Sequence, residues 1–158
     1  MDRKIVQNFN LALQECEKAL KLREVPVGAV IINKDGKCLA RAHNIKESTF
    51  DPCGHAEIIA IRKATKKIKN WRLTDCELFI TLEPCVMCLA ACIHSRIKKV
   101  YYGAQDKKAG SVSLNFKLES DKRLNHQLEL IYEPIEKCSK ILSHFFKQKR
   151  KENRERKL

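Results

Sequence analysis

The sequence predicts an α/β protein in which helices cover both faces of one sheet, a three-layer α/β/α arrangement. First, short apolar runs typical of strands alternate with longer segments of helical periodicity along the 158 residues. Second, the two segments richest in metal-binding side chains each stand just before a predicted helix, a usual place for a site on such a sheet. Third, no repeat or interdomain linker interrupts the chain, so one domain over residues 1–158 is predicted.

The N-terminal half is predicted to form a helix, a strand pair and a second helix. Apolar residues of the opening helix recur at steps of three and four, as on one helical face: Ile5, Phe9, Ala12, Cys16 and Ala19. Strands are predicted on both sides of Asp35-Gly36, a pair typical of hairpin turns: residues 27–32 and 37–42. After a polar loop over 43–54, a helix is predicted from about His55 to Lys66.

The C-terminal half continues the alternation. The predicted elements are a buried strand over 76–82, a helix from Cys85 to about Ser95, a strand over 99–104, a long and partly helical connection over 105–126, and a strand over 128–132. Pro134 opens a basic terminal helix, predicted over about 134–158. Its buried face is expected to carry Ile135, Cys138, Ile141 or Leu142, and Phe145.

His55-Ala56-Glu57 and Pro84-Cys85-Val86-Met87-Cys88 together indicate a metal site. Zinc favours imidazole nitrogen and thiolate sulfur, so His55, Cys85 and Cys88 are the natural ligands. Three protein ligands leave one tetrahedral position for water, which distinguishes a catalytic zinc from a structural one. Glu57 is close enough to exchange protons with that water without binding the metal. H-x-E followed by P-C-x-x-C is a known signature of zinc-dependent base deaminases.

The spacing of both motifs fits the start of a helix. Cys85 and Cys88 are one turn apart on one helical face, and Pro84 suits the first helical position. Both thiols would then lie where the helix dipole favours thiolate. His55 and Glu57 would be about 200° apart on an ideal helix, so they can share a site only where the chain is just entering it. The alternatives are a structural zinc knot, which lacks a fourth ligand of convincing spacing, or buried cysteines without metal.

The net charge and the cysteine content indicate which kind of partner the protein binds and in which cellular compartment it works. Lys and Arg number 32 against 19 Asp and Glu, and the net charge of +13 favours a polyanionic partner, although a lysine-rich surface can also lack a function. Residues 147–158 hold seven basic and two acidic residues, a net charge of +5. Eight irregularly spaced cysteines without a secretory signal predict a reducing cytoplasm. No apolar stretch approaches the roughly 18–20 residues of a membrane span, so no membrane partner is expected.

Several runs closely resemble the bacterial tRNA-specific adenosine deaminase family, usually called TadA: REVPVGAV (23–30), HAEIIAIRKA (55–64), NWRLTDCELFITLEPCVMC (70–88), IHSRIKKVYYGAQD (93–106) and FFKQKR (145–150). The resemblance covers nearly the whole chain. It implies a cytidine-deaminase-like fold with a five-stranded mixed sheet, and a homodimer. It also implies deamination of the wobble adenosine to inosine in an arginine tRNA anticodon, with ammonia released.

Carried over by position, the resemblance implies one zinc ion per chain, held by His55, Cys85 and Cys88, with Glu57 as the proton shuttle. Zinc lowers the pKa of its bound water to about 7, and Glu57 would take that water's proton and pass protons to N1 of adenine and to the departing amine.

The remaining carried-over residues concern the RNA. Asn44 matches a residue that contacts the target nucleoside, and Asp106 matches one near the RNA backbone. Asn44 could instead cap a turn, and Asp106 could be a solvated loop acid. Phe146 and Arg150 match a terminal helix that lies against the anticodon loop. Phe145 and Phe146 are about 100° apart on a helix, so one is expected in the core and the other, Phe146, free to stack on a base.

The chain departs from the family pattern at two places. Cys53 stands in Pro52-Cys53-Gly54, where many relatives have Pro-Thr-Ala. It is interpreted either as a small buried residue in place of Thr or as an alternative, redox-sensitive ligand. The connection over 110–126 also departs, so Asn125 and His126 receive no role beyond a possible place near the RNA.

Two other functions are compatible with parts of this pattern. A deaminase of a free base such as guanine or cytosine would have the same zinc motifs but no need of a basic terminal helix. A zinc-stabilised RNA-binding module without catalysis would have no need of Glu57 beside an open zinc.

Overall fold

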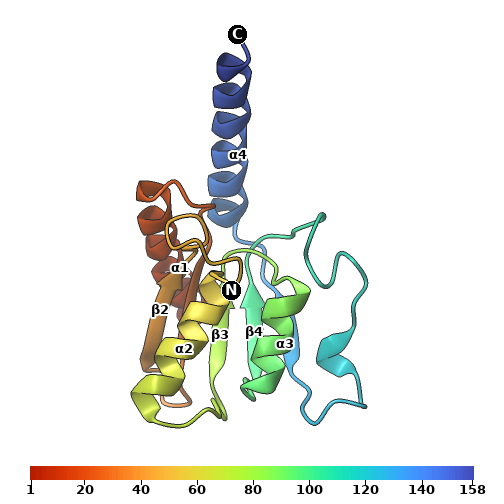
Figure 1. The fold of residues 1–158 in the computed structure, drawn as a ribbon. Helices are drawn as coiled ribbons and strands as arrows, with labels where there is room; N and C mark the ends of the chain where they lie inside the picture. The colour runs from red at the N-terminus through yellow and green to blue at the C-terminus, as the bar shows by residue number, and fades with distance from the viewer.

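The computed structural model describes residues 1–158 and has a single five-stranded sheet in the order β2-β1-β3-β4-β5 (Figure 1). Its strands are β1 (Gly28–Ile32), β2 (Cys38–His43), β3 (Glu77–Ile80), β4 (Lys99–Tyr102) and β5 (Glu129–Tyr132). β1 pairs antiparallel with β2 and β3, whereas β3, β4 and β5 are parallel to one another. The mixed five-stranded sheet implied by the resemblance is therefore confirmed.

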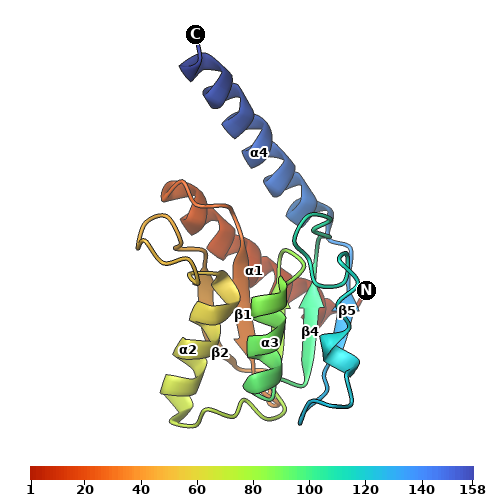
Figure 2. The ribbon, with the colours of Figure 1, turned by 45° about the vertical axis from the view of Figure 1, so that its right-hand side comes forward.

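Helices cover both faces of this sheet, as predicted. They are α1 (Arg3–Lys21), α2 (Ala56–Ile68), α3 (Val86–His94) and α4 (Glu136–Arg156), with a short 3-10 turn, η1 (Leu118–Ser120). Figures 1 and 2 show α2 and α3 side by side on one face and α1 on the other. None of the helices combines the length and the apolar composition that a membrane span requires.

The core forms where the opening helix packs on the first strand. Phe9, Ala12, Cys16 and Ala19 are buried on α1, as their spacing predicted, whereas Ile5, the first residue of that pattern, is half-buried. A Cβ atom on Gly28 would overlap the carbonyl oxygen of Ala12, so this position must be glycine for α1 to approach β1 so closely. β1 is buried along its whole length, because it lies between two other strands and between two helical layers.

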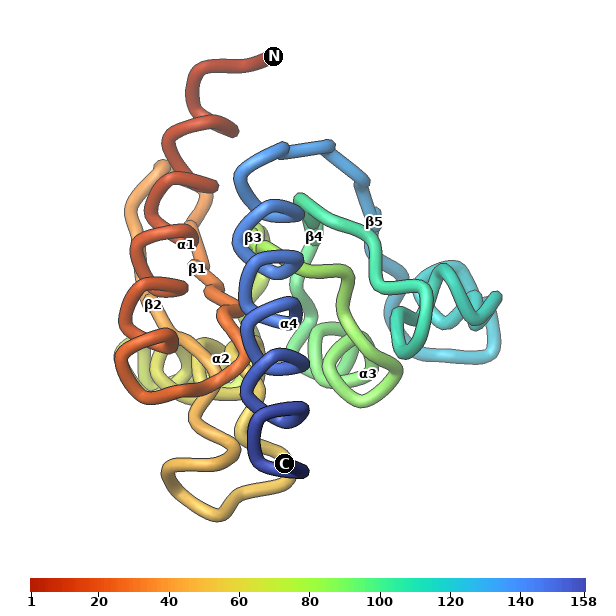
Figure 3. Tube along the Cα trace, turned by 90° about the horizontal axis from the view of Figure 1, so that it is seen from above, coloured from red at the N-terminus to blue at the C-terminus, as the bar shows by residue number.

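The terminal helix α4 leaves the body of the domain. Only Cys138 and Leu142 are buried on it, and the rest of the helix projects beyond the end of the sheet (Figures 1 and 2). Seen from above in Figure 3, its first half lies beside α1, and residues of both helices line one groove. The helix ends at Arg156 rather than 158 and begins at Glu136 rather than Pro134, with Ile135 as its N-cap.

The long connection between β4 and β5 contains η1 and is otherwise irregular, in agreement with its partly helical prediction. His126, near its end, has Nε2 at 2.7 Å from the carbonyl oxygen of Ile97. This contact ties the connection to the segment between α3 and β4 and gives His126 a structural role.

Candidate active site

Both metal-binding motifs lie at helix starts at the same end of the sheet. His55 is the N-cap of α2 and has an extended backbone, and Glu57 follows in the first turn. The expectation that the chain is just entering its helix at His55 is therefore correct. Cys85 is likewise the N-cap of α3, and Cys88 lies in the first turn.

The prediction that Pro84 takes the first helical position is wrong. The helix begins at Val86, because the backbone of the two preceding residues is engaged elsewhere. Cys85 forms an isolated antiparallel bridge with Gly110, and the carbonyl oxygen of Pro84 accepts a hydrogen bond from Ser111 N at 2.9 Å. The loop after β4 thus holds Cys85 in an extended conformation just before α3.

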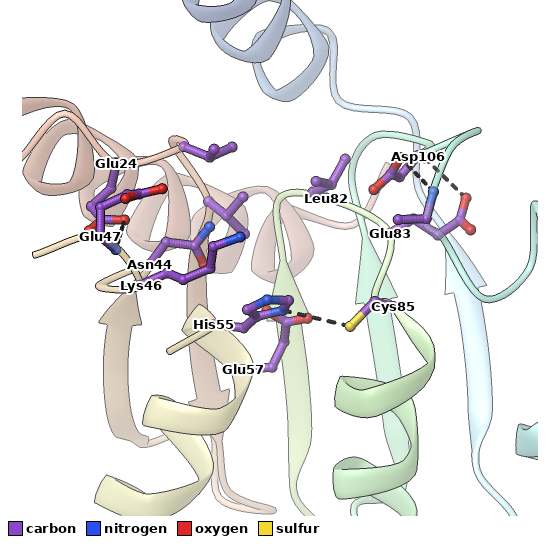
Figure 4. A pocket seen from close by; sticks show the side chains of 13 residues that line it. Glu24, Asn44, Lys46, Glu47, His55, Glu57, Leu82, Glu83, Cys85 and Asp106 are labelled. Atoms are coloured by element: carbon purple, nitrogen blue, oxygen red, sulfur yellow. Dashed lines mark hydrogen bonds between the residues drawn. The ribbon is translucent and has the colours of Figure 1, made fainter. Parts of the chain in front are cut away.

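The ligand atoms of His55, Cys85 and Cys88 converge on one point. His55 Nδ1 lies 3.6 Å from Cys85 Sγ (Figure 4) and 3.4 Å from Cys88 Sγ, and all three atoms are within 4.8 Å of one another. In a tetrahedral zinc site with ordinary bond lengths, a nitrogen and a sulfur ligand are separated by about 3.6 Å. The three side chains therefore fit a metal ion of this kind without rearrangement.

The thiols are electrostatically prepared for a cation. The pKa of Cys85 is lowered to about 4, first by the hydrogen bond with Cys88 and further by His55. The pKa of Cys88 is raised, mainly by its hydrogen bond to Cys85 and by burial. The first proton thus leaves the pair easily and the second is retained, so a metal ion would replace that second proton.

Glu57 is the carboxylate that lies beside the metal-binding cluster. It is only 4% exposed, and burial raises its pKa above that of an ordinary glutamate. Figure 4 shows its carboxylate beside His55, on the side that faces Cys85. A buried carboxylate with a raised pKa next to a metal-binding cluster is suited to accept and return a proton.

A pocket of about 200 Å³ opens onto this cluster. Its walls come from the segment before β1, the loop between β2 and α2, and the loops that follow β3 and β4: Glu24, Val25, Val27, Asn44, Lys46, Glu47, Leu82, Glu83, Asp106 and Ala109. His55, Glu57 and Cys85 form its floor. Of the residues that the resemblance assigned to RNA, Asn44 and Asp106 line the pocket, whereas Phe146 and Arg150 lie on α4.

Asn44 links the pocket wall to the metal-binding helix. Its Oδ1 accepts a hydrogen bond from Ala56 N at 2.9 Å and so satisfies one of the free donors at the start of α2. Asn44 can therefore both cap a backbone N–H group and contact a ligand in the pocket. Its amide oxygen accepts the hydrogen bond within the protein, and its NH₂ group can still donate two hydrogen bonds.

Asp106 closes a turn at the start of the connection. Its Oδ1 accepts hydrogen bonds from the backbone N–H groups of Lys108 and Ala109, at 3.1 and 3.2 Å. Asp106 is half-buried, so it is more than a solvated loop acid. Its proximity to the RNA backbone stays a prediction.

Cys53 is neither buried nor part of the ligand group. It is exposed, and the metal-binding group consists of His55, Cys85 and Cys88. The interpretation of Cys53 as a small core residue is wrong because the neighbouring Gly54 takes the buried position, with Asp51 O and Lys46 within 3.2 Å of where its Cβ would be.

Sequence reasoning missed two carboxylates that shape the pocket. Glu24 is buried and accepts hydrogen bonds from Ser48 N at 2.7 Å and Glu47 N at 3.2 Å. Glu83 is buried and accepts from Ser113 Oγ at 2.7 Å, Ser113 N at 2.9 Å and Asp106 N at 3.2 Å. Each therefore fixes one of the two loops that flank the metal-binding cluster. The only signal in the sequence was that each glutamate stands next to a run of apolar residues that form a buried segment.

Glu83 also explains why residue 110 is a glycine. A Cβ atom on Gly110 would overlap Glu83 Oε2, so Gly110→Ala is expected to displace the loop and destabilise the fold by about 1–3 kcal/mol. Urea denaturation measures the change. In a Glu83→Ala background the same substitution should cost less, because the clash with the carboxylate is gone and only the overlap with the backbone carbonyl oxygen of Asp106, at 2.6 Å, remains. Equal costs in both backgrounds would contradict the assigned contact.

Phe146 faces solvent as predicted, but the prediction that Phe145 lies in the core is wrong, because α4 projects from the domain and only Cys138 and Leu142 are buried on it. Phe146 is 43% exposed, Phe145 is half-buried, and their rings contact edge to face with centroids 5.3 Å apart. Arg150 is exposed one turn further along α4, in a stretch formed by His144, Lys147, Gln148, Arg150, Lys151 and Arg154.

Fold and site together define a class of protein. The protein has a mixed five-stranded sheet, and a His-Cys-Cys group and a buried glutamate lie at the starts of two of its helices. These features define a deaminase with the cytidine deaminase-like fold. The MafB19-like deaminase family accordingly matches residues 3–150. A tRNA-specific adenosine deaminase from Aquifex aeolicus is 44% identical over 142 residues, which are 90% of this chain and 93% of that protein. The chain belongs to the tRNA-specific adenosine deaminase family.

The fold of this chain is also similar to those of solved deaminase structures. One from a study of A-to-I editing by tRNA:A34 deaminases at the wobble position of transfer RNA has a TM-score of 0.81 and 37% identity, covering 87% of this chain and 99% of that one. A guanine deaminase from Bacillus subtilis has a TM-score of 0.62 and 29% identity, covering 95% of each chain.

Proposed function

We propose that this protein deaminates adenosine to inosine at the wobble position of a tRNA anticodon, arginine tRNA being the expected substrate, with one zinc ion held by His55, Cys85 and Cys88. The observation that carries this proposal is the three-ligand cluster with buried Glu57 at the floor of a pocket of about 200 Å³. The substrate is supported by the relatives, which are named for tRNA adenosine.

A zinc ion at this site would activate a water molecule as a Lewis acid and bring its pKa to about 7. Glu57 accepts a proton from the attacking water and delivers it to N1 of adenine. The same carboxylate then moves the proton of the new C6 hydroxyl to the amino group, which departs as ammonia. Glu57 therefore carries the proton between these transfers. Adenosine and water thus give inosine and ammonia, and Glu57 returns to its initial state.

Asn44 is proposed to orient the base in the pocket. Its oxygen is held by Ala56 N–H, so the NH₂ group is the part that can donate to an acceptor nitrogen of the purine ring. The adenine must leave the anticodon stack to reach the floor, at a cost of a few kcal/mol. Binding of the flanking RNA offsets that cost, and Asp106, Phe146 and Arg150 are proposed to take part in it.

We further propose a homodimer acting in the cytoplasm, with residues 1–158 as one deaminase domain. The connection between β4 and β5 exposes Val112, Leu114 and Phe116 close together in sequence, and such exposed apolar side chains favour a protein interface. The location is supported by the tRNA-acting relatives and by eight cysteines that are all free.

The decisive experiment compares substrates. Purified protein is incubated with bulk tRNA, an anticodon stem-loop, free guanine, free cytosine and adenosine, and inosine and ammonia are measured. We expect inosine to form in the tRNA and in the stem-loop, and no reaction of the free bases or of free adenosine. Ammonia from free guanine or cytosine with unchanged tRNA would favour a free-base deaminase, and RNA binding without any deamination would favour a non-catalytic RNA-binding module.

The terminal helix provides a second prediction. Deleting residues 147–158 removes seven basic residues from the projecting part of α4, so affinity for the anticodon stem-loop should fall. The slope of log K against log salt should become shallower by about 0.7–0.9 for each phosphate that the protein no longer neutralises. Folding should survive, because all twelve residues are exposed and the buried Cys138 and Leu142 remain.

A matched control removes charge elsewhere. Lys66→Gln with Lys67→Gln neutralises two bases in the last turn of α2, at the opposite end of the sheet from the pocket, and should leave the salt slope unchanged. If the truncated protein binds and deaminates the stem-loop as well as the full chain at every salt concentration, the basic helix end is only solvated surface.

A further inference from the structure

Phe50 is the most exposed aromatic side chain of the protein, and neither the fold nor the proposed chemistry accounts for it. It is 93% exposed, in the loop between β2 and α2 that ends at His55. Asn44, Lys46 and Glu47 of the same loop line the pocket. The backbone N–H of Phe50 lies 3.5 Å from the carbonyl oxygen of Glu47, so the aromatic ring is attached one turn away from the pocket wall.

The loop holds Phe50 in a defined position. Phe50 has φ +52°, a left-handed conformation that is unfavourable for a bulky residue and persists only when the surroundings impose it. Hydrogen bonds from Thr49 N to Ile45 O at 3.1 Å and from Asp51 N to Lys46 O at 3.0 Å fix the backbone on both sides.

A buried carboxyl group holds this loop in place. Glu24, 1% exposed, accepts from the backbone N–H groups of Glu47 and Ser48. A buried carboxylate is costly unless hydrogen bonds compensate it, so the loop is anchored to the protein core. An anchored loop that points an aromatic ring entirely into solvent presents that ring as a surface for contact.

We propose that Phe50 is a stacking platform for a nucleobase that flanks the target adenosine, an inference that rests on the proposed function. When the target base leaves the stack, its neighbour loses a stacking partner, and an aromatic ring on the loop that lines the pocket can replace that partner. Every nucleobase offers a flat π face, so such a contact contributes to binding with little sequence preference.

The surroundings of Phe50 favour a base over a second protein chain. Its neighbours in the loop, Ser48, Thr49 and Asp51, are polar, and the other exposed apolar residues belong to other segments, such as Leu22 at the end of α1 and Val112, Leu114 and Phe116 in the connection between β4 and β5. An isolated ring among polar groups suits the stacking of a flat, hydrogen-bonding base, whereas protein interfaces centre on contiguous apolar patches.

The test compares Phe50→Ala, Phe50→Leu and Phe50→Trp in equilibrium binding and steady-state deamination of an anticodon stem-loop. Phe50→Ala should raise Kd and KM by about 5- to 150-fold, the range measured for loss of one base–aromatic stack, with a smaller change in kcat. Phe50→Trp should bind like the unmodified protein, and Phe50→Leu should remain impaired because it keeps an apolar side chain without a π face. Trp71→Ala, which removes a 53% exposed aromatic beyond the far end of α2, is the matched control and should leave Kd unchanged.

A direct readout locates the contact. A stem-loop carrying 5-iodouridine at each position next to the target is irradiated with the protein, and we expect a crosslink at Phe50 that Phe50→Ala abolishes. Unchanged Kd in Phe50→Ala, or a change in oligomeric state without a change in RNA binding, overturns the proposal. A protein that binds the stem-loop without deaminating it refutes the proposed function but still tests Phe50 through Kd. A protein that does not bind it refutes both.

Discussion

Replacing Glu57 by alanine is expected to abolish nearly all deamination while leaving the fold and the metal in place. The attacking water then has no proton acceptor, and N1 and the departing amine have no proton donor. One general acid–base group is typically worth about 10²–10⁴-fold, and a carboxylate that serves several transfers should reach or exceed the upper end. The measurement is kcat/KM on an anticodon stem-loop, with metal content determined on the same sample.

The control for this prediction is Glu17→Ala, which removes an exposed glutamate from α1 and should preserve activity. Glu57→Gln separates charge from shape, because glutamine fills the same buried space without accepting the proton. It should be as inactive as Glu57→Ala. Activity of Glu57→Ala within tenfold of the unmodified protein would remove Glu57 from the mechanism.

Replacing Cys88 by alanine is expected to cause a large loss of bound zinc from a starting value of about one ion per chain. Cys88 Sγ lies 3.4 Å from His55 Nδ1, and two remaining ligands cannot hold zinc in a tetrahedral site. Changes to residues that merely support a ligand lower metal affinity by about 10–100-fold, so loss of a ligand itself should exceed that range. Metal analysis after dialysis against a weak chelator measures the effect.

Cys53→Ala is the matched control for Cys88→Ala. It removes a thiol two residues before His55 that is exposed and outside the ligand group, so zinc content should not change. Full retention of zinc in Cys88→Ala would mean that another thiol is the true ligand. Loss of zinc in Cys53→Ala but not in Cys88→Ala would identify that thiol as Cys53.

The order of helices and strands could be predicted from the sequence because it depends on periodicity. The apolar spacing of α1 and the turn pair at Asp35-Gly36 specify local structure through interactions between residues a few positions apart. Boundaries were less well predicted. Pro84 suits a helix start by its own geometry, yet α3 begins at Val86 because Pro84 O and Cys85 are bonded to the loop at 110–111.

The sequence by itself determined the alternation of helices and strands and indicated the candidate ligands and Glu57, since H-x-E and C-x-x-C are short-range patterns. Only the tertiary structure decided that Glu24 and Glu83 fix the loops beside the pocket, and that Phe50 stands in solvent on one of them. Glu24 and Ser48 are 24 positions apart and Glu83 and Ser113 are 30 apart. Contacts over such separations arise when whole elements pack against one another, and no pattern within a few residues encodes them.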